Sequence, residues 1–153
     1  MNHISESIRY IGADDLRLDL FENQYKLPFG VSYNSYLILD LKVCVLDTID
    51  KRATRDWLYN LKTELNGRKP DYLVISHMEP DHSANIETIA SEYPDMKLVV
   101  NNKTIPILKQ FTDIEGIDDR IYEVKEGDKL SLGEHTLSFY MAPMVHWPEV
   151  MVT

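Results

Sequence analysis

The chain has 153 residues, 44% of them hydrophobic and 27% charged, which suits one ordinary soluble domain and is short for two. Its 25 acidic side chains outnumber the 16 basic ones and give a formal net charge of −9, so we expect neither nucleic acid nor an anionic membrane among its partners. No apolar stretch approaches the roughly 20 residues of a membrane span, and the first residues lack the basic start and apolar centre of a signal peptide.

Short strands are predicted in the first third of the chain, over 7–11, 16–21, 35–39 and 43–47. The segment between the second and third strands, 22–33, contains Pro28 and Gly30 and is expected to form a loop. Cys44, the single cysteine, falls in the fourth strand and is expected to pack in the core. One unpaired thiol suits the reducing cytoplasm.

Helices and strands alternate in the rest of the chain. A helix is predicted over 51–66, with Asp50 as its N-cap, Gly67 as its stop, and one apolar stripe formed by Ala53, Trp57, Leu58, Leu61 and Leu65. Next come a strand over 72–75, a helix beginning at Ser83 with Ile86, Ile89 and Ala90 on one side, and a strand over 97–100. Thr104 is expected to cap a further helix, with Pro106 in its first turn and Ile107, Leu108 and Phe111 facing inward.

The predicted elements end with strands over 121–124, 129–132 and 136–141. The early strands follow one another directly, whereas the later ones alternate with helices. This order predicts an α/β fold in which helices flank a mixed sheet.

Four side chains of the kinds that bind metals are packed into six positions between a predicted strand and a predicted helix. They are His77, Glu79, Asp81 and His82. Burying this many polar groups needs a compensating cation, and open α/β sheets place their sites at the carboxyl ends of strands. Pro80 keeps Glu79 extended, so His77 and Glu79 can lean toward one metal and Asp81 toward a neighbouring one. The cluster predicts a metal site; the alternative is an N-capping Asp81 beside two exposed histidines.

His146 is a further candidate ligand, because it follows another predicted strand end and could reach the same edge of the sheet. Trp147 is expected either to form an apolar wall beside the ligands or to pack in the core. Tyr25, on the segment with Pro28 and Gly30, is a weaker candidate for a pocket wall. His3 and His135 lie near the terminus and in a turn-like segment, and both are expected to be solvated.

The segment His-x-Glu-x-Asp-His at 77–82, followed by His-Trp-Pro-Glu at 146–149, resembles the metallo-β-lactamase-like domain of the flavodiiron proteins, also called A-type flavoproteins. Residues 31–38 resemble the early strand of that family. The resemblance covers essentially the whole chain and implies that residues 1–153 form the first half of a metallo-β-lactamase-like αβ/βα sandwich. The rest of that domain and a flavodoxin-like FMN domain are then expected to lie outside these residues, and an uncovered half-domain should form a homo-oligomer.

The resemblance also implies a di-iron site. His77, Glu79 and His146 would bind one iron, and Asp81 and His82 would serve the second. A bridging Asp and a further His would come from outside the chain. Flavodiiron proteins reduce O₂ to water or NO to N₂O with electrons from FMN, which a donor such as rubredoxin or a flavin reductase supplies. The 153 residues alone are expected to be inactive.

Glu79 bears on the choice between this function and two alternatives. Hydrolases of the same superfamily carry His at this position. A carboxylate is harder and more anionic than an imidazole, so it favours iron over zinc and redox chemistry over hydrolysis by zinc hydroxide. A zinc hydrolase in which Asp81 helps to activate a metal-bound water is one alternative, and a metal-free scaffold fragment is the other.

Overall fold

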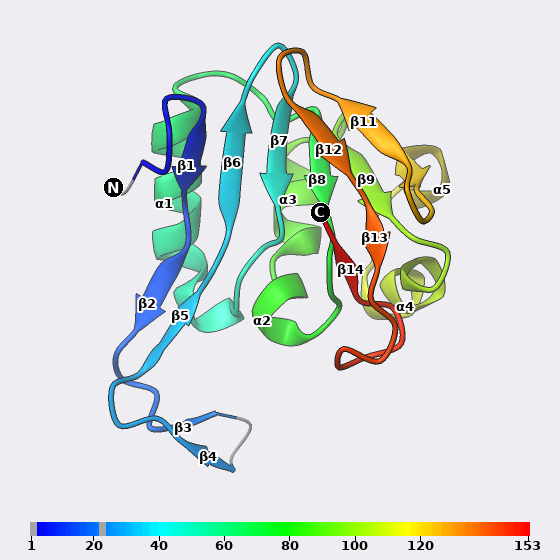
Figure 1. Ribbon diagram of the computed structural model, residues 1–153. Coiled ribbons are helices and arrows are strands. Elements are labelled where there is room, and N and C mark those ends of the chain that lie inside the picture. The colour runs from blue at the N-terminus through cyan, green and yellow to red at the C-terminus, as the bar shows by residue number, and fades with distance from the viewer. Residues whose placement is uncertain (1–2, 22–23) are drawn as a thin grey trace.

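The computed structural model describes residues 3–21 and 24–153, and a six-stranded sheet lies at its centre (Figure 1). The strands, in order across the sheet, are β1 (Ile8–Tyr10), β6 (Tyr36–Leu39), β7 (Val43–Leu46), β8 (Tyr72–Val74), β9 (Lys97–Val100) and β10 (Ile121–Glu123). β1, β6 and β7 pair antiparallel, whereas β7, β8, β9 and β10 pair parallel. The prediction of a mixed sheet is confirmed.

Helices cover one face of this sheet (Figure 1): α1 (Thr54–Leu65) after the 3-10 turn η1 (Lys51–Ala53), α3 (Ile86–Glu92), α4 (Thr104–Phe111) and α5 (Ile117–Arg120). The predicted stripe of α1 packs into the core, and Trp57 donates a hydrogen bond to Ser35 Oγ at 3.0 Å. The carboxylate of Asp50 accepts from the Arg52 backbone N–H at 2.8 Å, as the predicted N-cap should. The C-cap of α1 is Asn66, which is in the left-handed conformation and lies one residue before the predicted stop, Gly67.

The opposite face of the sheet packs against a second set of strands: β11 (Lys129–Ser131) paired with β12 (Thr136–Ser138), and β13 (Tyr140–Met141) paired with β14 (Met151–Val152) (Figure 1). Side chains alternate along each central strand, so Val45 faces the helices while the neighbouring Cys44 faces β11–β14. Cys44 is fully buried, as predicted. Both faces of the central sheet therefore pack against other elements within the described residues, and the expected self-association stays a prediction.

The segment before β6 differs most from its prediction. The strand expected over 16–21 is present only as β3 (Leu20–Phe21), and β2 (Ala13–Asp15) precedes it. The expected loop contains β4 (Tyr25–Lys26) and β5 (Val31–Tyr33), while its positions 22–23 lie outside the described residues. β2 pairs with β5 and β3 with β4, which gives a ribbon that extends from the body of the molecule (Figure 1). Pairs this short leave almost no periodic pattern in a sequence.

Two predicted helix starts are also displaced. A separate turn, α2 (Pro80–Ser83), precedes α3, so the helix expected from Ser83 is divided in two. At α4 the capping acceptor is Asn101 rather than Thr104, because Asn101 Oδ1 accepts from the N–H groups of Lys103 and Thr104. Phe111, expected to face inward, is exposed. Within the described residues, every helix is too short or too polar to span a lipid bilayer.

Candidate metal centre

Several side chains of the candidate centre lie where neighbouring parallel strands end. Asp47 follows β7, and His77 and Glu79 follow β8. Glu79 has an extended backbone (φ −61°, ψ 145°), as the following proline predicts, and Pro80 is the first residue of α2. Asp81 is therefore in a helical turn instead of the expected loop. The location matches the edge at which open α/β sheets carry their sites.

Three predicted ligands converge at this edge. One ligand atom each from His77, Glu79 and His146 lies within 4.8 Å of the others. Glu79 Oε2 is 3.0 Å from His77 Nε2 and 2.9 Å from His146 Nε2. His77 and Glu79 are buried, whereas the His146 side chain, on the loop between β13 and β14, is 68% exposed. The group therefore joins a buried pair to one ligand that solvent can reach.

Glu149 fixes the orientation of His77 and was missed in the sequence. Its Oε1 lies 2.8 Å from His77 Nδ1 and also accepts from the Met78 backbone N–H at 3.1 Å. Glu149 is 1% exposed, and Asn101 donates to its backbone carbonyl at 2.7 Å. A histidine that binds a metal usually donates its second N–H to a carboxylate in this way. The carboxylate three residues after His146 was the signal available in the sequence.

Asp81 and His82 form a second group beside the first. The His82 ring lies 5.3 Å from the His77 ring, and His82 Nε2 is 3.8 Å from Asp81 Oδ2. His82 Nδ1 is 2.9 Å from Asp47 Oδ2, and Asp47 Oδ1 accepts from the Ser76 backbone N–H at 2.6 Å. Asp47 was also missed, because it looks like an ordinary strand end until the fold brings it to His82.

Burial and charge act in opposite directions on the second group. Burial raises the pKa of Asp81 above its ordinary value, even though the charge of His82 opposes the shift. Burial alone would lower the pKa of His82, but the hydrogen bond to Asp47 and the nearby carboxylates outweigh it, so that pKa is raised. Asp81 Oδ1 is buried and has no hydrogen-bond partner among the described residues.

The two predicted wall residues lie in different surroundings. The Trp147 ring is 5.2 Å from the His77 ring and perpendicular to it, and the residue is 36% exposed, so it stands beside the ligand group and not in the core. Tyr25 is 60% exposed on β4. His3 is exposed, as expected, although its Nε2 lies 3.3 Å from Glu64 Oε1. His135 is only partly exposed, because it hydrogen-bonds to Asp40 and Ser7.

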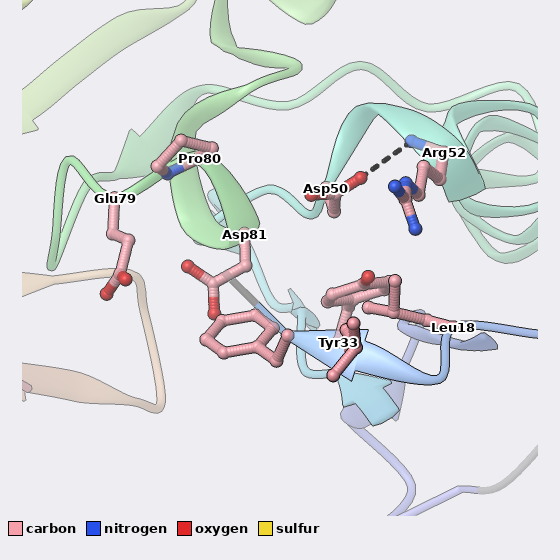
Figure 2. Close-up of a pocket in the computed structure, with 9 residues that line it drawn as sticks. Leu18, Tyr33, Asp50, Arg52, Glu79, Pro80 and Asp81 are labelled. Carbon is pink, nitrogen blue, oxygen red and sulfur yellow. Dashed lines mark hydrogen bonds between the residues drawn. The ribbon is translucent and has the colours of Figure 1, made fainter. Parts of the chain in front are cut away.

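A cavity of about 260 Å³ opens beside Glu79 and Asp81. Figure 2 shows Asp81 on one side, Arg52 on another, and Tyr33 closing the space between them. Tyr33 is 2% exposed, and burial, with the charge of Asp50, raises its pKa to about 12, so its hydroxyl stays protonated at neutral pH. Tyr25 is not among the residues that line this cavity.

A family model described as ODP family beta lactamase matches residues 31–153. The chain belongs to this family. Its sequence is 33% identical to the flavo-diiron protein FprA2 of Clostridium acetobutylicum over 98% of the chain, and 32% identical to the anaerobic nitric oxide reductase flavorubredoxin of Vibrio vulnificus over 99%. It covers 37% and 31% of those two proteins, so it spans about a third of their length.

Solved structures give the same result. The flavodiiron protein from Giardia intestinalis superimposes with a TM-score of 0.87 at 26% identity, covering 97% of this chain and 36% of that one. The rubredoxin oxygen:oxidoreductase from Desulfovibrio gigas does so with a TM-score of 0.87 at 29% identity, covering 99% and 37%. The predicted fold class and the resemblance to the metallo-β-lactamase-like domain of flavodiiron proteins are confirmed.

The donor atoms of the first group suit a metal ion. The imidazole nitrogens of His77 and His146 lie close to a carboxylate oxygen of Glu79, and iron and other first-row metals accept this set of donors. The hydrogen bond that His77 Nδ1 donates to Glu149 leaves His77 Nε2 directed at Glu79. The chemistry of these residues therefore fits the iron that the family resemblance implies.

Proposed function

We propose that this chain is the metal-binding part of a flavodiiron oxidoreductase that reduces O₂ or NO. The observation that carries the proposal is the position of Glu79, whose carboxylate lies 3.0 Å from His77 and 2.9 Å from His146. Related hydrolases have a histidine at the position of Glu79. A hard, anionic ligand in its place favours iron over zinc.

His77, Glu79 and His146 would hold one iron, and Asp81 and His82 would serve the second. When bound, such an iron pair would bind O₂ or NO and take up the electrons needed to reduce them. The choice of residues rests on the convergence of the first group and on the adjacent position of the second.

The other residues of the chain hold these side chains ready. Glu149 keeps the proton of His77 on Nδ1, so that Nε2 presents its lone pair. Asp47 orients His82 in the same way from the end of β7. The Trp147 ring stands perpendicular to the His77 ring at 5.2 Å and adds an apolar wall beside it. Two carboxylates outside the proposed ligand set, Glu149 and Asp47, thus orient the rings of two proposed ligands.

The whole protein is proposed to resemble its longer relatives in the remaining parts. FMN would be held outside residues 1–153, in a flavodoxin-like domain, and the missing bridging and terminal ligands would come from the rest of the metallo-β-lactamase-like domain. A donor such as rubredoxin or a flavin reductase would supply electrons. We propose a homo-oligomer in the cytoplasm.

Anaerobic purification of the whole parent protein tests the proposal. We expect iron together with a flavin absorption spectrum, and consumption of O₂ or NO when a reduced donor is added. Zinc without flavin, together with hydrolytic turnover, would support the zinc hydrolase. A protein that takes up no transition metal would support the metal-free scaffold.

A further inference from the structure

A second cluster of polar side chains lies at the edge of the sheet opposite the candidate metal centre. It consists of Ser7, just before β1, Asp40, in the turn between β6 and β7, and His135, in the turn between β11 and β12. In Figure 1 the β6–β7 turn lies at the top, whereas α2 lies toward the bottom. The cluster shares no residue with the metal ligands.

The three side chains form a continuous hydrogen-bonded chain. Ser7 Oγ is 3.0 Å from His135 Nε2, and His135 Nδ1 is 2.7 Å from Asp40 Oδ2. A hydroxyl, an imidazole and a carboxylate in this order make up the arrangement that activates a serine nucleophile. The two distances fall within the range expected between a nucleophile, its base and the group that orients the base.

Asp40 is held as an orienting carboxylate should be. Its Oδ2 also accepts from the His135 backbone N–H at 2.7 Å, and its Oδ1 from the Glu134 backbone N–H at 3.2 Å. These bonds, with the one from the His135 ring, hold the pKa of Asp40 well below its ordinary value. An ionised Asp40 keeps the ring proton on Nδ1 and turns the Nε2 lone pair toward Ser7.

Two backbone donors converge beside the Ser7 hydroxyl. The N–H groups of Ser7 and Ile8 both donate to Ser5 Oγ, at 3.3 and 3.0 Å, and Ser5 Oγ lies 3.3 Å from Ser7 Oγ. Stabilising the oxyanion of acyl transfer needs paired donors of this kind, aimed at one oxygen. Ser5 is exposed, so rotation of its side chain frees both N–H groups for another oxygen.

We propose that Ser7 is the nucleophile of a second, acyl-transferring site that accepts small activated carboxylic esters. Ser7 Oγ attacks the ester carbonyl carbon while its proton passes to His135 Nε2, and the N–H groups of Ser7 and Ile8 bind the oxyanion. The ester C–O bond then breaks, and His135 gives the proton to the leaving alcohol. Water, deprotonated by His135, attacks the acyl-serine; the bond from Ser7 Oγ to the acyl carbon breaks, and His135 returns the proton to Ser7 Oγ. One ester and one water thus give one acid and one alcohol.

The exposure of the cluster sets the class of substrate. Ser7 is only partly buried and 30% of the His135 side chain is exposed, so a small reagent reaches both from solvent. Because Ser7 lies in a surface turn, its substrate must be an ester that is already reactive, with a good leaving group. Esters such as aryl acetates, and the fluorophosphonates that mimic them, meet this requirement.

Covalent labelling of the purified protein tests the proposal. We expect a fluorophosphonate probe to modify Ser7, as located by peptide mass spectrometry, and the adduct to disappear in Ser7→Ala. His135→Gln, which keeps an amide able to hydrogen-bond Asp40, should slow the labelling by about 100-fold or more, because it removes the general base. Aryl acetate hydrolysis should fall in parallel and should not change when a metal chelator is added.

The control is Ser131→Ala, because Ser131 is an exposed serine on β11 whose Oγ accepts a hydrogen bond from Gly133. This variant should label as the parent does. The proposal is overturned if Ser7 is modified no faster than Ser131, or equally fast in a folded His135→Gln variant with an unchanged melting temperature. The cluster would then be a structural cross-link between three turns, whatever the outcome at the metal centre.

Discussion

The two ligand groups at the carboxyl edge of the sheet are assembled to different degrees. In the first, Glu79 lies between His77 and His146, and their donor atoms already meet. In the second, Asp81 and His82 stand 3.8 Å apart, and His82 is bonded to Asp47. The difference shows that this chain already brings the donor atoms of the first group together. In the second group the His82 ring is oriented, but its donor atoms do not converge with those of Asp81.

Replacing Glu79 should give the largest effect and should affect the first group directly. Loss of a residue that only hydrogen-bonds a metal ligand lowers metal affinity by about 10–100-fold. We expect Glu79→Ala to lower the affinity for ferrous iron by more than this, because it removes a ligand itself. Anaerobic titration with metal analysis measures this affinity. Glu87→Ala, on the exposed side of α3, is the matched control and should bind iron like the parent. Equal affinity in both variants would contradict the role given to Glu79.

Glu149→Gln should give the next largest effect, through His77. The amide keeps the shape and the acceptor for His77 Nδ1 but loses the charge, so we expect iron affinity to fall by about 10–100-fold with the fold retained. Glu149→Ala should also lose about 1–3 kcal/mol of stability for each buried donor left unpaired, at His77 and Met78. Calorimetry and thermal unfolding separate the two effects. Unchanged affinity in Glu149→Gln would mean that His77 needs no orienting carboxylate.

Asp47→Asn should act on the second group only and should reveal it through pH. The raised pKa of His82 means that its bond to Asp47 contributes stability below the ordinary histidine pKa of about 6.5, and that this contribution is lost as pH rises through the folded-state value. In Asp47→Asn burial prevails, so the pKa of His82 should fall and the stability advantage at pH 5.5 over pH 8.5 should shrink. Asparagine tolerates the positive φ of 54° at this position.

Nuclear magnetic resonance titration of the His82 ring, with urea unfolding at the two pH values, checks this prediction in the metal-free protein. Iron affinity at the first group should stay within about threefold of the parent, because Asp47 touches none of its ligands. A large loss of that affinity would show that the two groups are coupled through His82 and are not separately assembled.

Tyr25→Ser should give the smallest effect. Tyr25 is exposed and does not line the cavity beside Glu79, so we expect stability to change by less than about 0.5 kcal/mol and iron affinity not to change. The same assays apply. A clear loss of iron affinity would restore Tyr25 as a wall of the pocket.

The features that could be predicted from the sequence are those with a local pattern. The central strands and α1 were recognisable because buried strands are apolar and α1 has a clear helical stripe. His77 and Glu79 were found because their residue types are costly to bury without a cation, and His146 was found because it follows another predicted strand end. Their meeting point depends on which strands are neighbours, and a linear pattern does not encode that.

Other residues were missed because their roles depend on contacts that only the fold creates. Glu149 and Asp47 are ordinary carboxylates in the sequence and gain their roles only when the fold places them against His77 and His82. The bonds of His135 to Ser7 and Asp40 span 128 and 95 positions of the chain. Long-range pairs of this kind follow from the topology and leave no local signal.

Anomalous diffraction at the iron absorption edge tests the central claim most directly. Crystals of the protein loaded anaerobically with ferrous iron should show an anomalous peak bounded by His77 Nε2, a Glu79 carboxylate oxygen and His146 Nε2, with His77 Nδ1 still held by Glu149. The account is contradicted if iron binds elsewhere, or if full loading leaves no peak among these three side chains.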